Sequence, residues 1–447
     1  MMHHTEKGNS TMSMTMSRGG RLAALAGLGV AAALALSACA PPGASTDESA
    51  APTPGGDAAT GTLKVGFLSP TSGNFAVAGQ EMLDGWNLYW EENGNEVNGV
   101  TIETIAEDDA GNPETALTKA HKLVEQDGVD IVVGPLIAST ASAVAAYTAP
   151  LGIPNLHPVA ASNDLTQQNW NDFTVRTGSM GGTQSTYPGG VWAATEGGYS
   201  KAVTLCHDYS FGWESCAGFV QGFVENGGEI VQQIWAPNTT TDWGGYAAQV
   251  QAALAGGADV VFVALAGGAG GPGFLTAYLD AGGSIEPLLL NCCAADQGTL
   301  RAMGDRIIGM KSVSYWAEGR DAEVTREFVD AYIAKTGQVP GAYIAGGYIT
   351  ASLLAQVIEE RGLLTGADLI DAITSYTFED SIFGKVSWDE YNNTIAPVYI
   401  REVQKGEDGL LYNVPIAEFE DVDQWLGKGA PADVRSIVPY DQTNQGL

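Results

Sequence analysis

The chain has 447 residues, a formal net charge of −32 at pH 7 and five cysteines. So acidic a composition argues against binding to nucleic acid and against direct adhesion to anionic lipid. The chain is also too long for a single hydrophobic core, which predicts at least two domains.

The first residues are typical of an export signal. Arg18 and Arg21 precede an apolar stretch, residues 22–36, that leads into a small-residue box ending at Cys39. The stretch is short for a membrane span, although a transmembrane anchor is the competing interpretation. The order of basic region, apolar core and cysteine resembles a lipoprotein signal peptide over residues 1–38, which implies cleavage before Cys39 and lipidation of its thiol.

Residues 39–61 follow as a segment dominated by Pro, Gly, Ala, Ser, Thr and Asp. They offer almost nothing to bury, so we expect a disordered tether between the lipid and the folded part. The expected location is therefore extracytoplasmic, on the outer face of the cell membrane.

From residue 62 onward, short apolar runs alternate with segments that have helical spacing. This alternation predicts an α/β fold with two doubly wound, Rossmann-like parallel sheets covered by helices. The predicted strands are residues 63–68, 100–106, 131–133, 153–156, 202–206, 229–235, 259–265, 287–290 and 396–403, with a short β segment at 384–390. The predicted helices are residues 80–93, 113–126, 212–226, 243–255, 274–281, 323–335, 342–360 and 367–373, and a further Ala-rich helix begins near residue 138.

The ends of two predicted strands indicate a ligand site. The strand at 131–133 is followed by small and hydroxyl-bearing residues at 138–142, and the strand at 153–156 by a similar run at 157–163. Open α/β sheets bind ligands outside the carboxyl ends of their strands, and a helix N-terminus attracts an anion. We therefore predict that these two strand ends hold a small molecule by a carboxylate, although ordinary strand-to-helix turns have the same spacing.

Four further cysteines in an exported chain allow disulfides. Cys206 and Cys216 close a short loop and are the predicted pair. A bond between the adjacent Cys292 and Cys293 requires a strained ring, so free thiols are the alternative there. No spaced cysteine or histidine pair accompanies them, and the glycine run at 266–273 lacks the Gly-Lys-Ser/Thr of a nucleotide-binding loop. We therefore expect no metal site and no cofactor.

Eight short motifs follow one another between residues 63 and 403. In chain order they are Ser69-Pro70-Thr71-Ser72-Gly73, Glu107-Asp108-Asp109, Gly134-Pro135, His157-Pro158-Val159-Ala160, Arg176-Thr177, Asp208-Tyr209-Ser210-Phe211-Gly212, Pro340-Gly341-Ala342-Tyr343 and Trp388-Asp389-Glu390. Together they resemble the type I solute-binding proteins of the branched-chain amino acid ABC transporter family. The pattern is most similar to members that bind aromatic or other hydrophobic carboxylates.

The resemblance implies two lobes that close on a ligand and stabilise the form recognised by the permease. The chain is expected to cross between the lobes near residues 176–182, 312–316 and 377–384. The implied division is residues 62–178 with 315–378 for lobe 1, residues 179–314 with 379–412 for lobe 2, and a C-terminal extension at 413–447. The implied partners are the permease and ATPase subunits of an importer, the protein is expected to be a monomer, and no enzymatic activity is expected.

The resemblance also implies the ligand-binding positions. The carboxylate clamp of amino-acid-binding members falls on Ala138, Ser139, Thr140, Ala160, Ala161 and Ser162. Further positions expected at the ligand are Phe75, Ala78, His157, Phe211, Cys293 and Tyr343.

The second lobe departs from the amino-acid-binding pattern. The position of the ammonium-binding acid falls near Cys292 or Cys293, and that of an accompanying tyrosine on Phe211. A buried ammonium without an anionic partner costs several kcal/mol. The predicted ligand is therefore an aromatic or hydrophobic organic acid. A branched-chain or hydrophobic amino acid, an amide or urea is the alternative ligand, and a sensor that presents its closed form to a membrane receptor is the alternative function.

Overall fold

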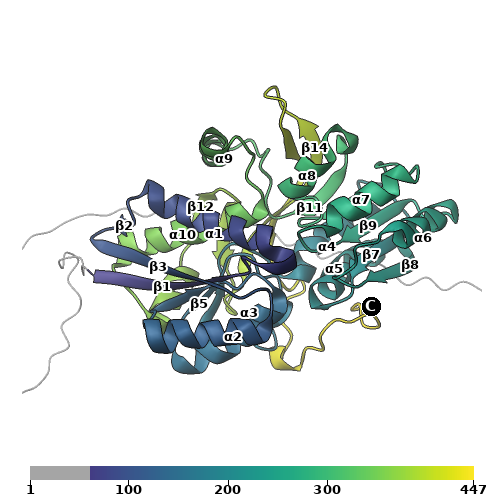
Figure 1. Cartoon of the computed structure of the whole chain (residues 1–447). Coiled ribbons are helices and arrows are strands. Elements are labelled where there is room, and N and C mark those ends of the chain that lie inside the picture. Colours follow the sequence, from purple (N-terminus) through teal and green to yellow (C-terminus); the bar gives the residue numbers. More distant parts are fainter. Residues whose placement is uncertain (1–60) are drawn as a thin grey trace, which may run out of the picture. The chain divides into compact units, whose positions relative to one another are not determined.

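The computed structural model describes residues 61–447 (Figure 1). The predicted signal peptide and, apart from Gly61, the predicted tether lie outside the described residues. Within the described part, no helix combines the length and apolar character needed to cross a membrane.

The first lobe is built on a six-stranded sheet in the order β2-β3-β1-β4-β5-β6. Strand β2 pairs antiparallel with β3, and the other strands pair in parallel. The strands are β1 (Gly61–Ser69), β2 (Glu96–Val97), β3 (Val100–Asp108), β4 (Ile131–Val133), β5 (Asn155–His157) and β6 (Thr174–Arg176). The central strands β1 and β4 are buried on both faces, as a parallel sheet between helices requires.

Helices cover this sheet and carry the chain from strand to strand. They are η1 (Gly73–Phe75), α1 (Ala76–Glu92), α2 (Pro113–His121), which continues as η2 (Lys122–Asp127), α3 (Ala138–Thr148), η3 (Ala149–Leu151) and η4 (Asn163–Leu165). Three later helices are α9 (Glu323–Thr336), α10 (Ala342–Arg361) and α11 (Gly366–Thr374). Helix α10 packs against α1, and α11 contacts β6, so the chain returns to the first lobe after building most of the second.

The second lobe is built on a nine-stranded mixed sheet. Its order is β12-β13-β14-β11-β10-β9-β7-β8, and β15 pairs with β14. The strands are β7 (Lys201–His207), β8 (Glu229–Ala236), β9 (Val260–Ala264), β10 (Leu288–Asn291), β11 (Lys311–Ser314), β12 (Phe378–Ser381), β13 (Gly384–Trp388), β14 (Thr394–Lys405) and β15 (Leu411–Val422). Strands β7 to β11 pair in parallel, and β12 to β15 add an antiparallel part.

The helices of the second lobe are α4 (Gly182–Ala194), α5 (Ser210–Glu225), α6 (Gly244–Ala255), α7 (Gly270–Asp280) and α8 (Gln297–Met303), followed by η5 (Gly304–Ile307). The two-lobed α/β architecture confirms the predicted fold class. Each strand and helix predicted from the sequence has a counterpart in the structure.

Some elements have no predicted counterpart. Strands β2, β6, β11 and β12 are two to four residues long, which is too short for a periodic pattern. Helix α4 contains Pro188 and several glycines, which weakened its helical signal. Strand β15 lies largely within the expected C-terminal extension, where no structure was predicted, so residues 413–422 belong to the sheet of the second lobe.

The remaining C-terminal residues contact both lobes. The guanidinium of Arg435 lies 5.8 Å from the ring centroid of Trp170 and donates a hydrogen bond to the Trp170 carbonyl oxygen at 3.0 Å. Further along, the amide of Gln221 on α5 donates to the hydroxyl of Tyr440 at 3.2 Å. The tail, yellow in Figure 1, is therefore part of the folded body.

Helices α1 and α10 approach each other so closely that only glycine fits at two positions. A Cβ atom added to Gly347 would lie 2.1 Å from the carbonyl oxygen of Met82, and one added to Gly85 would lie 2.0 Å from that of Ile344. Both neighbours are backbone atoms, which move only if a helix moves. The helix pair therefore depends on these two glycines.

We expect Gly347→Ala to lower the free energy of unfolding by roughly 1–3 kcal/mol, because the added methyl group forces the two helices apart. Urea unfolding followed by circular dichroism measures this difference. Gly245→Ala on α6 is the matched control, since a Cβ there meets no atom within 4 Å and should be neutral or slightly stabilising. Equal stabilities of the two variants would contradict the packing argument.

Candidate functional site

A cavity lies between the two lobes, at the carboxyl ends of the parallel strands of both sheets. The empty space there, counted together with the open solvent at its mouth, is about 550 Å³. The first lobe lines it with Phe75, Leu136, Ile137, Ala138, Val159, Ala161 and Tyr343. The second lobe lines it with Ser185, Tyr209, Phe211, Ser215, Ala266, Gly267, Asn291, Cys292 and Cys293, and Tyr315 lines it just after β11. This is the place where open α/β sheets bind ligands.

The residues that line this cavity carry no Asp, Glu, Lys or Arg side chain. Asp296, three residues after Cys293, is buried but does not line the cavity. Its Oδ1 accepts a hydrogen bond from the backbone N–H of Ala342 at 2.7 Å, at the start of α10. A cationic ligand would therefore find no carboxylate side chain on the cavity wall.

Asn291, the last residue of β10, supplies an unused hydrogen-bond donor. The side chain is 1 % exposed, and its Oδ1 accepts from the backbone N–H of Ala294 at 3.0 Å. Its Nδ2 has no hydrogen-bond partner among residues 61–447. A buried donor left without a partner costs about 1–3 kcal/mol. The amide of Asn291 is thus available to an acceptor inside the cavity.

Three buried tyrosines add hydroxyl groups to the wall. Burial raises the pKa of Tyr209, Tyr315 and Tyr343 well above the ordinary value of a tyrosine. The cysteines near them, and the carboxyl groups of Glu214 and Asp296, raise these pKa values further. All three phenols are therefore neutral at pH 7, and neutral phenols donate hydrogen bonds to an anion.

Aromatic and aliphatic groups form the rest of the wall. The ring centroids of Tyr209 and Phe211 lie 6.1 Å apart at the start of α5. Phe75 closes the opposite side, together with Leu136 and Ile137. Such walls suit a flat hydrophobic ligand whose polar end meets the tyrosine and asparagine donors.

Half of the predicted ligand-binding residues line the cavity. These are Phe75, Ala138, Ala161, Phe211, Cys293 and Tyr343. The other six, which are Ala78, Ser139, Thr140, His157, Ala160 and Ser162, do not line it. For all twelve, contact with a ligand stays a prediction.

Three of the predicted residues that do not line the cavity show where their side chains lie instead. Ser139, the second residue of α3, is exposed. Thr140 donates its hydroxyl proton to the carbonyl oxygen of Ile137 at 2.7 Å. His157 is buried with neither ring nitrogen hydrogen-bonded within the described chain. Burial and the charge of Arg176 lower its pKa to about 3, so the ring is neutral.

Arg176 holds the second strand end in place. Its fully buried guanidinium donates from Nη1 to the carbonyl oxygen of Ala160 and from Nη2 to that of Ser162. The indole N–H of Trp388 in turn donates to the carbonyl oxygen of Arg176 at 2.6 Å. Burial lowers the pKa of Arg176 to about 10, which leaves the group charged at pH 7. The backbone next to Ala161 is thus shaped by a cation that does not reach the cavity.

Glu214 joins the two lobes beside the cavity. Its Oε2, on α5 of the second lobe, accepts from the backbone N–H of Asn163 in the first lobe at 3.0 Å. The amide of Asn163 donates to the hydroxyl of Thr183 on α4 at 2.6 Å. Burial and the nearby Asp164 raise the pKa of Glu214 to about 8, although the Asn163 N–H and Arg176 act in the opposite direction. The lobes are therefore in direct contact in this structure.

The cysteines take two different states. Cys206 on β7 and Cys216 on α5 form a disulfide with a Cα–Cα distance of 6.4 Å. Cys292 and Cys293 are free thiols whose sulfur atoms lie 3.3 Å apart. Among residues 61–447, no group of three or more His, Cys, Asp or Glu side chains is placed to hold a metal ion.

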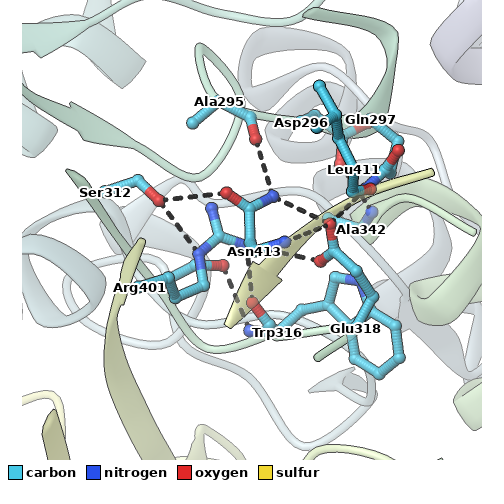
Figure 2. A network of polar contacts seen from close by, with 11 residues as sticks. Ala295, Asp296, Gln297, Ser312, Trp316, Glu318, Ala342, Arg401, Leu411 and Asn413 are labelled. Carbon is cyan, nitrogen blue, oxygen red and sulfur yellow. Dashed lines mark hydrogen bonds and ion pairs between the residues drawn. The ribbon is translucent and has the colours of Figure 1, made fainter. Parts of the chain in front are cut away.

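A buried polar network holds residues 295–297, which come shortly after the two cysteines in the chain (Figure 2). Arg401 donates from Nη1 to the carbonyl oxygen of Trp316 at 2.7 Å, and the same nitrogen lies 3.9 Å from the carboxylate of Glu318. The amide of Asn413 donates to Glu318 at 2.8 Å and to the carbonyl oxygen of Ala295 at 3.1 Å. Because Asn413 lies on β15, the unpredicted strand supports the segment that carries the cysteines.

Sequence reasoning did not identify five polar residues of the wall, which are Ser185, Tyr209, Ser215, Asn291 and Tyr315. Two of them carried a usable signal: Asn291 directly follows a predicted strand, and Tyr209 belongs to one of the eight motifs. Ser185 lies in an unpredicted helix and Tyr315 beside an unpredicted short strand, so their positions depended on the tertiary fold.

Comparisons with known proteins agree with this architecture. Residues 62–408 match the periplasmic binding protein family. A relative, Leu/Ile/Val-binding protein homolog 6 of Brucella melitensis biotype 1, is 28 % identical over 365 residues, which cover 80 % of this chain and 92 % of the relative.

Two solved structures are similar over most of the chain. One is a solute-binding protein of an ABC transporter from Rhodopseudomonas palustris BisB5 in complex with 3,4-dihydroxybenzoic acid, with a TM-score of 0.75, 30 % identity, and 81 % of this chain and 98 % of that chain covered. The other is such a protein from Rhodopseudomonas palustris HaA2 in complex with p-hydroxybenzoic acid, with a TM-score of 0.74, 28 % identity, and 82 % and 100 % covered. Two α/β lobes with a cavity between their strand ends, and a family match over residues 62–408, place this chain in the periplasmic binding protein family, as its motifs predicted.

Proposed function

We propose that this protein is the extracytoplasmic substrate-binding component of an ABC importer, and that it captures a small aromatic or other hydrophobic carboxylate between its lobes. The observation that carries the proposal is a cavity wall of aromatic and aliphatic side chains with hydrogen-bond donors and without any Asp, Glu, Lys or Arg side chain. The benzoate-type ligands of the two similar solved structures support the same class of solute.

A carboxylate finds suitable donors in this cavity. Helix α3 begins at Ala138, its N-cap Ile137 provides no side-chain cap, and both residues line the cavity. The first backbone N–H groups of such a helix attract an anion. The amide of Asn291 and the tyrosine hydroxyls supply further donors. Several N–H donors together stabilise a buried carboxylate without a cation.

An α-amino acid fits this wall less well. Its ammonium group carries three donors and needs acceptors, preferably an anion, when it is buried. The name of the Brucella relative nevertheless makes branched-chain amino acids the alternative solute class to test. Amides and urea, which carry no charge, are tested with them.

The proposal includes attachment to the membrane and delivery of the solute to the permease. The protein acts as a monomer tethered through lipidated Cys39, closes on its solute and delivers it to the permease without making or breaking a covalent bond. Closure requires that the solute gain contacts in the closed form that it lacks in the open form. A cavity lined by residues of both lobes meets this requirement.

Isothermal titration calorimetry of the purified protein tests the solute class. We expect binding of benzoate or a hydroxybenzoate, at least tenfold weaker binding of the matching benzamide, and no binding of leucine or urea. Tight leucine binding without aromatic acid binding would overturn the proposal.

Asn291→Asp tests the site itself. This nearly isosteric change replaces an amide donor by an acceptor with negative charge, so we expect the affinity for a benzoate to fall about 10- to 100-fold. Asn226→Asp at the end of α5 is the control, because it changes the net charge equally on an exposed position outside the cavity. A benzoate affinity that is unchanged in Asn291→Asp would remove Asn291 from the site.

A further inference from the structure

We propose that Cys292 and Cys293 form a redox modification site in the wall of the cavity, where exchange with a disulfide oxidant converts the two thiols into a vicinal disulfide and changes ligand affinity. The regulatory part of this inference rests on the proposed function. The chemical part concerns the two thiols alone.

The two thiols are placed for this reaction. They follow the last residue of β10, both line the cavity, and their sulfur atoms lie 3.3 Å apart. The S–S distance of a disulfide is about 2 Å, so closing the bond moves the sulfurs together by about 1 Å and forms the strained ring of a disulfide between adjacent residues. Cys292 is buried, Cys293 is half-buried, and both line the cavity between the lobes.

The surroundings lower the pKa of one of the two thiols. The hydrogen bond from Cys293 lowers the pKa of Cys292, and the nearby Arg401 lowers it further, against the effect of burial. The pKa of Cys293 is raised by the same pair interaction and by burial. The other groups that act on the pair are the carboxyl group of Asp296 and the hydroxyl of Tyr343.

Hydrogen bonds hold Arg401, the cation near the two thiols, in place (Figure 2). Its Nε donates to the hydroxyl of Ser312 at 3.1 Å and its Nη1 to Trp316, while Nη2 has no hydrogen-bond partner within residues 61–447. Cations lower the pKa of nearby thiols and make them better nucleophiles at neutral pH. The same lobe already contains the Cys206–Cys216 disulfide, and disulfides persist in the extracytoplasmic compartments where this family acts.

The reaction is thiol–disulfide exchange. The Cys292 thiolate attacks one sulfur of an oxidant R–S–S–R, the oxidant bond breaks, and the departing R–S⁻ takes up a proton. Cys293 then releases its proton to water and attacks the sulfur of Cys292, which expels the second R–S⁻. Two electrons pass from the two cysteines to the oxidant, which leaves as two R–SH molecules.

Oxidation alters the wall that the ligand meets. The reduced pair carries S–H donors and a negative charge when Cys292 ionises, and Cys293 interacts with the hydroxyl of Tyr343. The disulfide is neutral and has no donor. Because an anionic ligand is repelled by a thiolate, the reduced form should lose benzoate affinity as the pH rises from 7 to 9, more than the oxidised form does. Glu214 titrates in both the reduced and the oxidised form. The difference in pH dependence between the two forms therefore measures the contribution of the thiols.

Mass spectrometry of the full chain carrying Cys39→Ser tests the chemical step. After incubation with oxidised glutathione, we expect the protein to lose the mass of two hydrogen atoms and to stop reacting with phenylarsine oxide, which requires a free dithiol. Cys293→Ser should instead stop at a glutathione adduct on Cys292. Retention of both thiols, or an adduct on the chain with Cys293 intact, would overturn the proposal.

Calorimetry with benzoate tests the consequence. We expect the affinities of the reduced and oxidised forms to differ at least threefold at pH 8, and dithiothreitol to restore the reduced value. The double variant Cys292→Ser/Cys293→Ser should show no response to either treatment, and its circular dichroism spectrum controls for folding. Equal affinities of the two forms would overturn the regulatory part. If no aromatic acid binds, the proposed function fails while the mass result still decides the chemical step.

Discussion

Replacing Arg176 with methionine should destabilise the protein by about 3–5 kcal/mol, because the variant leaves buried polar groups without their cation. The carbonyl oxygen of Ser162 loses its donor, and that of Ala160 keeps only the hydroxyl of Ser179. The carboxyl groups of Asp164 and Glu214 lose the nearby positive charge. Methionine fills a similar volume, so the loss measures the charge and the hydrogen bonds. Urea unfolding at pH 7, followed by circular dichroism, gives the free energy difference.

Two further variants sharpen this test. Arg176→Lys keeps the charge but not the two-pronged donor geometry, so it should retain only part of the stability. Arg435→Met removes an exposed arginine that also donates to backbone carbonyl oxygens, and should cost less than about 1 kcal/mol. Similar stabilities of Arg176→Met and Arg435→Met would show that the buried guanidinium does not hold the strand end.

The carboxyl group of Glu214 should make stability fall as the pH rises. Its pKa in the folded protein is raised from 4.5 to about 8, mainly by burial. The folded state therefore favours the protonated form, and this contribution is complete below about pH 4.5 and is lost as the pH rises through about 8. A tenfold change in proton affinity corresponds to about 1.4 kcal/mol, so the whole contribution is on the order of a few kcal/mol.

Parallel urea unfolding of wild type and Glu214→Gln between pH 5 and 9 measures this effect. Glutamine stays neutral, so the stability of the wild type relative to the variant should decline across the range. Glu225→Gln, at the exposed end of the same helix, is the matched control and should not reproduce the decline, because the pKa of Glu225 is lowered rather than raised. Parallel pH profiles of wild type and Glu214→Gln would contradict the raised pKa.

Because Glu214 contacts the Asn163 backbone in the other lobe, its ionisation should also change the affinity for the ligand. If closure brings the two groups together, ionisation of Glu214 opposes closure, and the benzoate affinity of the wild type should weaken between pH 7 and 9 more than that of Glu214→Gln. Calorimetry at the same pH values tests this extension.

The sequence carried local information on the fold and on part of the site. Strands β1, β4 and β9 were predictable because a parallel strand between two helical layers is a continuous apolar run. The turns after β4 and β5 were predictable as neighbours because strand ends of such sheets share one edge, and residues of both turns line the cavity. Helix α4 was not, since Pro188 and several glycines lower its local helix propensity, while the close approach of its glycines to α5 appears only in the fold.

The side chains that complete the site depended on contacts between distant parts of the chain. Ser139 matched the expected clamp position, yet its side chain is exposed, because the register of α3 directs Ala138 to the cavity. Arg176 and Glu214 stood in the sequence without visible partners, and only the fold brought them to Ala160 and Asn163.

By itself, the sequence determined the alternation of strands and helices, the two lobes and the edge of the sheets at which the cavity lies, since these follow from local periodicity and chain connectivity. Tertiary structure alone decided which donors face the cavity and which charges are buried beside it. Hydrogen bonds and pKa values depend on distances between atoms that the chain order leaves open.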